Sequence, residues 1–189
     1  MAVSEVAICN TALIRCGTER ITSLTETNRR AEFCNEEYSK ARREVLASHP
    51  WNCASVRVEL GQDVTTPEFE YSYRYTVPSD TLRIFTDDDP DEDSDWRREG
   101  DYILSDSSTL EILAVQDITD VTRFPPFVEN AIAMNLANRI CYALSQSAAL
   151  AKEIKDECRR TLAEARSYDA QESSARVWKA HDWTTAVRS

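Results

Sequence analysis

The stretch YSKARREVLASHPWNCASVRVEL, residues 38–60, contains the point at which the sequence changes from a helical pattern to a strand pattern. Apolar side chains recur at three- and four-residue steps up to Val45, and the ring of Pro50 disfavours helical backbone at the residue before it. From Trp51 onward, apolar and polar residues alternate, as in residues 56–60. The stretch therefore predicts a helix that ends before Pro50 and leads directly into a β-strand.

Helical patterns lie on both sides of this stretch. Ser4 as an N-cap and Gly17 as a C-terminal stop predict a short opening helix. Residues 127–144 are apolar around most of the circumference, which is typical of a helix in the centre of a bundle. Ser147 is placed to cap a last long helix that ends near Tyr168. The buried face of the second helix is predicted to consist of Ala31, Cys34, Tyr38, Ala41 and Val45.

Strand patterns occupy the middle of the chain. Alternation at 56–60 and 71–77, with further apolar runs at 82–85, 102–104 and 110–113, predicts one small antiparallel sheet. The predicted fold class is therefore α+β. A four-helix bundle formed by residues 1–50 and 123–170 carries an inserted β-subdomain at 51–122, and a C-terminal arm follows at 171–189.

Charge and composition exclude several classes of protein. The net charge of −11 disfavours nucleic-acid binding by phosphate neutralisation, although duplex DNA could still slide past such a surface without being held. No stretch approaches the ~18 apolar residues of a membrane span, and the N-terminal residues do not resemble a signal peptide. The six cysteines show no tight framework, so we expect reduced thiols in a cytosolic setting.

Catalytic and metal-binding patterns are weak in this sequence. His49 and Cys53 have an H-x3-C spacing, but no second histidine and no CxxC motif accompany them, so a helix-flanking role is favoured over zinc binding. The tyrosines at 71, 73 and 75 could stack on bases, but such a platform needs a basic groove, so packing on the helical bundle or on a neighbouring subunit is favoured. We therefore expect a protein that is not an enzyme and has no cofactor, metal or catalytic residue.

The densest charge cluster is DDDPDEDSD, residues 87–95. A calcium loop that starts at Asp89 would need glycine at its sixth position and glutamate at its twelfth, where the sequence has Ser94 and Gly100. A solvated hairpin tip is the favoured interpretation, and it supplies seven of the negative charges. The residues of this acidic tip are Asp87, Asp88, Asp89, Asp91, Glu92, Asp93 and Asp95.

The C-terminal arm differs in charge from the rest of the chain. Over residues 171–189, three basic residues stand against Glu172 and Asp182, a net charge of +1. Tryptophan and arginine are enriched at binding hot spots, so we expect the arm to be disordered alone and to order on a partner. The alternative is that it folds back on its own helices. The candidate binding residues are Arg176, Trp178, Lys179, Trp183 and Arg188.

Five segments, taken together, resemble the head-to-tail adaptors of short-tailed phages, the tail tubular protein A family. They are ICNTALIRCGTERITSL (8–24), the stretch 38–60 with its His-Pro-Trp, YSYRYTVPSDTLRI (71–84), WRREGDYILSD (96–106) and FPPFVENAIAMNLANRICYALSQS (124–147). The resemblance covers residues 4 to 170. The acidic run and the arm depart from the family's pattern.

The resemblance implies a structural protein of the virion. Twelve subunits would form a ring beneath the portal vertex, extend the DNA channel and dock the tail nozzle, after assembly in the host cytoplasm. The arm would bind the portal protein or a neighbouring subunit, the acidic tip could face the nozzle protein, and duplex DNA would pass without specific binding. Two alternatives remain open: an adaptor or head-completion protein of a long-tailed phage, and an unrelated non-enzymatic interaction protein.

Overall fold

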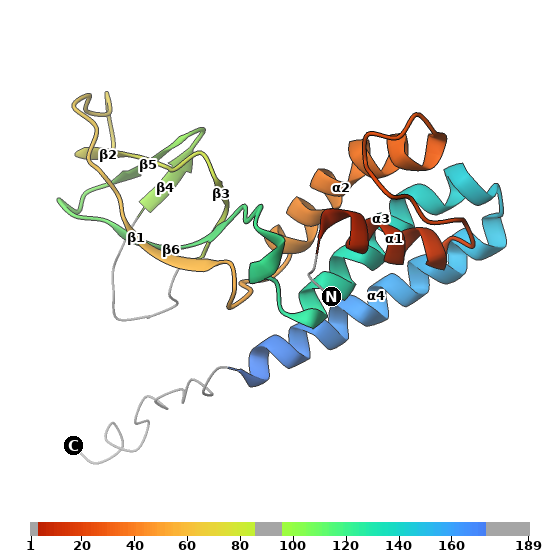
Figure 1. Ribbon diagram of the computed structural model, residues 1–189. Coiled ribbons are helices and arrows are strands. Elements are labelled where there is room, and N and C mark those ends of the chain that lie inside the picture. The colour runs from red at the N-terminus through yellow and green to blue at the C-terminus, as the bar shows by residue number, and fades with distance from the viewer. Residues whose placement is uncertain (1–3, 86–95, 173–189) are drawn as a thin grey trace, which may run out of the picture.

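The computed structural model describes residues 4–85 and 96–172. Within these residues the fold is α+β, with four helices and two small three-stranded antiparallel sheets inserted between the second and third helices (Figure 1). The helices gather on one side of the molecule and the sheets on the other, as Figure 1 shows. The predicted fold class and the position of the insertion are confirmed.

The helices in the described part of the chain are α1 (Glu5–Arg15), α2 (Arg29–Ala47), α3 (Pro126–Ser145) and α4 (Ala148–Gln171). The predicted N-cap of α1 is confirmed, because Ser4 accepts a hydrogen bond from the Ala7 amide. Gly17 ends the helix with a φ of +69°, a conformation that a side chain would disfavour. Ser147 caps α4 by accepting from the Leu150 amide, as predicted.

The helix α3 lies in the centre and packs against the other three helices. Burial around most of its circumference confirms the prediction from its apolar sequence. On the facing side of α2, all five residues predicted for its apolar face are buried. The core also takes in side chains from α1 and α4, including Leu13, Ile154 and Cys158.

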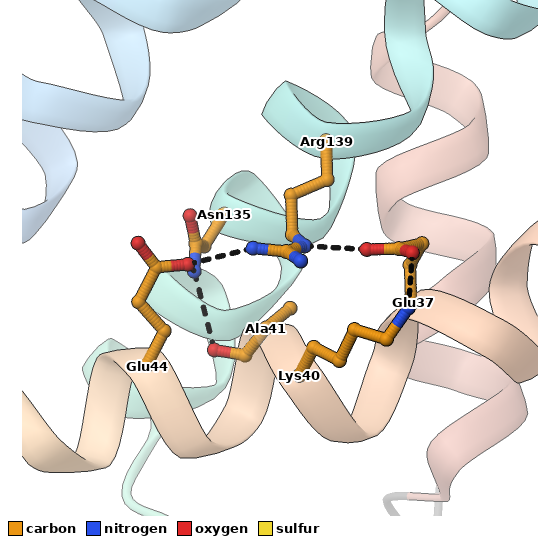
Figure 2. A network of polar contacts seen from close by, with 6 residues as sticks. All are labelled: Glu37, Lys40, Ala41, Glu44, Asn135 and Arg139. Carbon is orange, nitrogen blue, oxygen red and sulfur yellow. Dashed lines mark hydrogen bonds and ion pairs between the residues drawn. The ribbon is translucent and has the colours of Figure 1, made fainter.

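Two polar residues of α3 connect it to α2 (Figure 2). Asn135 is 5% exposed and its amide donates to the Ala41 carbonyl at 3.2 Å and to a Glu44 oxygen at 3.0 Å. One turn later, Arg139 donates from Nε to Glu37 at 2.6 Å. A buried amide needs these partners, so only one register of α3 on α2 satisfies it.

The strands form two sheets, not the single sheet predicted. Their bounds are β1 (Ser55–Glu59), β2 (Tyr73–Thr76), β3 (Thr81–Phe85), β4 (Trp96–Glu99), β5 (Tyr102–Ser105) and β6 (Glu111–Gln116). The strand orders are β1-β6-β3 and β2-β5-β4, and a 3-10 turn at Val121–Arg123 leads to α3. Alternation identifies the inner face of a strand but not its neighbours, which is why the prediction of one sheet is wrong.

A second apolar cluster fills the space between the two sheets. It contains Tyr75, Ile103 and Ile112, and it is separate from the larger core of the helices. At the opposite face of the first sheet, Val115 is fully buried in the helical core. The first sheet is therefore shared by both cores, and it joins the sheets to the helices.

The last helix is longer than predicted. It runs to Gln171, whereas the sequence pattern indicated an end near Tyr168 and an arm from residue 171. The extra turn is stabilised by Asp169, which is 3% exposed and bonded to residues of the α2–β1 connection. None of the helices in the described ranges combines the length and apolar composition that a bilayer crossing requires.

Candidate interaction surfaces

Both sets of site residues predicted from the sequence lie outside the described residues. The arm residues Arg176 to Arg188 follow the end of α4, and the acidic tip Asp87 to Asp95 follows the end of β3. The structure therefore gives no geometry for either set. It does show how the elements that precede them are held.

The last turn of α4 is anchored to the connection between α2 and β1. The Asn52 amide donates to Asp169 Oδ1 at 3.0 Å, and the Asn52 side chain donates to the Asp169 carbonyl at 2.8 Å. The second carboxylate oxygen of Asp169 lies 3.2 Å from His49 Nε2. These three contacts link residues that are 117 or more positions apart in the sequence. They hold the C-terminal end of α4 against the segment that leads into β1.

His49 therefore has a structural partner in this connection. Burial lowers the pKa of His49 and outweighs the opposing attraction of the Asp169 carboxylate. Burial also raises the pKa of Cys53 to about 11, so this thiol stays protonated at neutral pH. Within residues 4–85 and 96–172, no group of three or more histidine, cysteine or acidic side chains could hold a metal ion.

An aromatic row crosses the same junction. The Trp51 ring is fully buried and its Nε1 donates to the Val45 carbonyl at 2.8 Å. Its centroid lies 6.3 Å from that of Phe127, which lies 6.3 Å from that of Tyr168. Tyr168 is 56% exposed, so the row ends as an aromatic side chain on the surface near the end of α4.

A buried ion pair fixes the sheets to α2 from the other side. Arg42 is 6% exposed and donates from Nε and Nη2 to Asp117 Oδ1 at 3.1 and 2.9 Å. Asp117 directly follows β6, and its amide donates to the Asp80 carbonyl before β3. Removing Asp117 would leave the buried Arg42 charge without this partner, whereas Asp117 also lies 3.6 Å from Arg43 Nε. The contact joins the end of β6 to α2.

The tyrosine row on β2 packs inward. Tyr75 is 1% exposed and its hydroxyl donates to the Ser107 carbonyl at 2.6 Å, while Tyr73 packs against the cluster between the sheets. Arg74 points to the other face, where it lies over the Tyr102 ring at 4.2 Å and pairs with Asp63. Tyr73 and Tyr75 therefore pack between the two sheets, and not on the helices as the sequence analysis expected.

Exposed apolar side chains mark a surface that the sequence analysis missed. Val64 and Phe69, in the loop between β1 and β2, are 103% and 73% exposed. Single apolar residues inside a polar loop carry no periodic signal, and so they could not be distinguished from residues that fold inward.

No known family model matches the chain, and no curated protein is significantly similar to it.

Proposed function

We propose that this chain is a structural protein of a virus particle, a head-to-tail adaptor that forms a ring under the portal, extends the DNA channel and docks the tail nozzle. The finer description of the fold, a four-helix bundle with a C-terminal arm at 171–189, belongs to the same proposal. The chain acts by binding the portal protein, the nozzle protein and its own copies, and it catalyses no reaction.

The observation that carries the proposal is the connection at residues 49–52. The His-Pro-Trp segment, which resembles the family at its most recognisable stretch, lies where the helices meet the inserted sheets, and Trp51 is fully buried there. The same connection holds the end of α4 through Asp169. Residues 49–52 thus connect the helices to the inserted sheets, as expected for a β-subdomain inserted between α2 and α3.

The rigid attachment of the two parts also supports an adaptor. The Arg42–Asp117 pair joins the end of β6 to α2, and the Asp169 contacts join the end of α4 to the segment that leads into β1. A subunit that must transmit contacts from a portal to a nozzle has to keep its two ends at a constant separation. A single rigid body meets that need, because loosely linked domains would move relative to each other.

The decisive experiment is electron microscopy of the purified chain mixed with the portal protein of the same virus. We expect rings of this chain attached to the portal, with twelve subunits in each ring. A chain that stays monomeric in the presence of portal protein would exclude the adaptor and favour an unrelated interaction protein. Rings that bind a long-tailed phage connector, and not a short-tailed nozzle, would support the long-tailed alternative.

A further inference from the structure

The first helix carries two buried thiols, and each of them lies next to a thiol of another helix. Cys9 lies in α1 and Cys16 directly follows it, seven residues later. Seven residues are about two helical turns, so the two side chains lie on the same side of the helix. That side packs against α2 and α3, and the two cysteines are 0% and 2% exposed.

The partner of Cys16 is Cys141 on α3. The Cys16 thiol donates to the Ala137 carbonyl at 3.7 Å. Ala137 lies one helical turn before Cys141, and helical side chains tilt toward the N-terminal end of their helix, so the Cys141 side chain lies over the same turn. The two thiols are close enough to share a hydrogen bond, and Cys141 is fully buried.

The partner of Cys9 is Cys34 on α2. Both side chains are fully buried in the core of the helices. The Cys9 thiol donates a hydrogen bond to the Cys34 sulfur, which raises the pKa of Cys9 and lowers the pKa of Cys34. Cys34 is therefore the more readily ionised member of the pair and the better nucleophile.

The other two cysteines have different surroundings. The charged side chains that act on Cys53 are those of Asp169, Arg123 and Glu172, and Glu44 acts on Cys158. All six thiols are free in the structure. Cys53 and Cys158 therefore serve as internal references for the two pairs.

We propose that α1 is a site of oxidative cross-linking, at which Cys9 joins Cys34 and Cys16 joins Cys141 in two disulfides. The first disulfide ties α1 to α2, and the second ties the end of α1 to α3. Both join sulfur atoms that the folded chain already holds side by side, so the helices need little movement to form them.

The oxidant is a small disulfide, for which oxidised glutathione is the probe. The Cys34 thiolate attacks one sulfur of the probe, the S–S bond of the probe breaks, and one glutathione thiolate leaves. Cys9 then loses its proton and attacks the Cys34 sulfur, so that the second glutathione leaves. Two protein thiols and one oxidised glutathione give one protein disulfide and two glutathione thiols, which take up the two protons. The same balance holds for Cys16 and Cys141.

Burial controls the rate of this exchange. It raises the pKa of Cys16 to about 12, and the protonated thiol is a poor nucleophile. The probe reaches either pair only when α1 leaves the core. Oxidation should therefore be slow in the folded chain and should go to completion when the chain refolds in the presence of the probe.

The cross-links gain a role where the chain leaves a reducing compartment. In the proposed function, the chain is assembled in the reducing host cytoplasm and is then carried by the released particle into an oxidising medium. This setting rests on the proposed function. The cross-links themselves need only this chain and a disulfide.

The test is a peptide map of the full chain after refolding in reduced and oxidised glutathione. Cleavage by trypsin after lysine and arginine places each of the six cysteines in a peptide of its own. The expected products are peptide 1–15 linked to 31–40, peptide 16–20 linked to 140–152, and free thiols in 44–57 and 156–159. Glutathione bound to the four paired cysteines without linked peptides would overturn the proposal, as would a different pairing such as Cys16 with Cys34.

Variants separate the two cross-links. Cys34→Ala should leave Cys9 unlinked and retain the link between Cys16 and Cys141, while Cys141→Ala should do the reverse. Cys158→Ala, at another buried cysteine of the same core, is the matched control and should retain both links. A cross-link from Cys9 to another cysteine in Cys34→Ala contradicts the assigned pairing. Where a variant fails to fold in a circular dichroism melt, the map of the parent chain still decides.

Stability provides a second measurement. The cross-linked chain should have an unfolding equilibrium constant at least about tenfold smaller than the reduced chain, because disulfides restrict the unfolded state. The link between Cys16 and Cys141 closes the longer segment, so Cys141→Ala should lose more of this gain than Cys34→Ala. A cross-linked chain that is less stable than the reduced chain would show that the helices must shift to join the sulfurs, and the proposal is then wrong.

Failure of this inference is distinguishable from failure of the proposed function. The peptide map and the melts use the chain alone, so they do not depend on the portal protein. A chain that forms rings on the portal but never forms the two disulfides overturns the cross-linking and leaves the adaptor proposal intact.

Discussion

Trp51 occupies the junction where the helices, the first sheet and the end of α4 meet. Its ring is fully buried and packs against Phe127, and its indole donates to the Val45 carbonyl. Trp51→Ala should lower the free energy of unfolding by roughly 3–5 kcal/mol, because it removes a large buried ring and leaves a cavity. Denaturant melts of the two proteins provide the measurement.

A matched pair of variants makes this prediction specific. Trp51→Phe keeps an aromatic ring and loses mainly the hydrogen bond, so its cost should be about 1–2 kcal/mol. Tyr142→Ala, at a residue that is 63% exposed, should change stability by less than about 0.5 kcal/mol. A loss below about 1 kcal/mol for Trp51→Ala would mean that the ring does not support the junction.

Glu26 provides a pH-dependent contact in the loop between α1 and α2. Its carboxylate accepts hydrogen bonds from the Thr22 amide and hydroxyl and from the Ser23 amide. These bonds lower the pKa of Glu26 to about 2. A folded-state pKa below the unfolded value stabilises the fold at higher pH, and that contribution is lost as the pH falls from 4.5 toward 2.

The predicted measurement is an NMR titration of the Glu26 carboxyl carbon, with a midpoint near 2. Glu26→Gln should flatten the acid part of the curve of unfolding free energy against pH, because the amide does not titrate there. Glu153→Gln, on an exposed face of α4, is the control and should leave the curve as it is. A midpoint at the ordinary glutamate value would show that the loop contacts do not persist in solution.

At the scale of elements, the last turn of α4 depends on a contact with another element. Asp169→Ala removes the buried acceptor of the Asn52 amide and of His49, and it should cost about 2–4 kcal/mol. Hydrogen exchange should quicken most at residues 166–172, with smaller changes in the rest of α4. Glu164→Ala, an exposed change on the same helix, is the control. Unchanged exchange in the last turn would contradict the anchoring role.

The positions of the helices and their buried faces were predictable from the sequence where the apolar residues repeat at helical spacing. In α2 the residues Ala31 to Val45 repeat at helical spacing, and each predicted apolar position is buried. The final turn of α4 was not predictable, because Asp169 looks like a surface residue until His49 and Asn52 are brought to it from more than a hundred residues away. Arg42 is also buried on α2 but was not among the residues predicted for its buried face, because its partner Asp117 lies 75 residues away in the sequence.

The sheets were less predictable than the helices. Alternation in residues 56–60 indicated the strand, but the pairing of β1 with β6 and of β2 with β5 joins segments that are distant in sequence. The separation into two sheets follows from that pairing and from no local signal. Phe69 carries no pattern at all, so the surface that it forms became visible only when the fold exposed it.

At the scale of the whole molecule, the charge of −11 makes a prediction about DNA. The isolated protein should not bind duplex DNA tightly, because release of counterions requires a positively charged surface that neutralises phosphates. Filter binding or fluorescence anisotropy at two salt concentrations provides the measurement. Tight binding that weakens steeply with salt would contradict the proposal that DNA passes through the channel of the ring without being held.

Deletion of the C-terminal arm should abolish binding to the portal without lowering the stability of the subunit. Deletion of residues 174–189 removes two of the four tryptophans, Trp178 and Trp183, together with Arg176, Lys179 and Arg188, and leaves α4 intact to Gln171. The core residues of the described part of the chain and the Asp169 anchor lie within the retained residues, so the melting temperature should remain nearly unchanged. Two buried indoles can contribute up to ~10 kcal/mol to a contact before the cost of ordering is subtracted, so attachment to the portal should be lost.

Two measurements on the truncated chain test this separation, a thermal melt and co-sedimentation with the portal protein. A chain that lacks only residues 184–189 retains both tryptophans and is the matched control, which should still attach. If the shorter chain melts well below the intact protein, the arm contributes to the subunit's own fold. If it melts normally and still attaches, the portal contact is made by the described surfaces, and the tryptophans of the arm have another role.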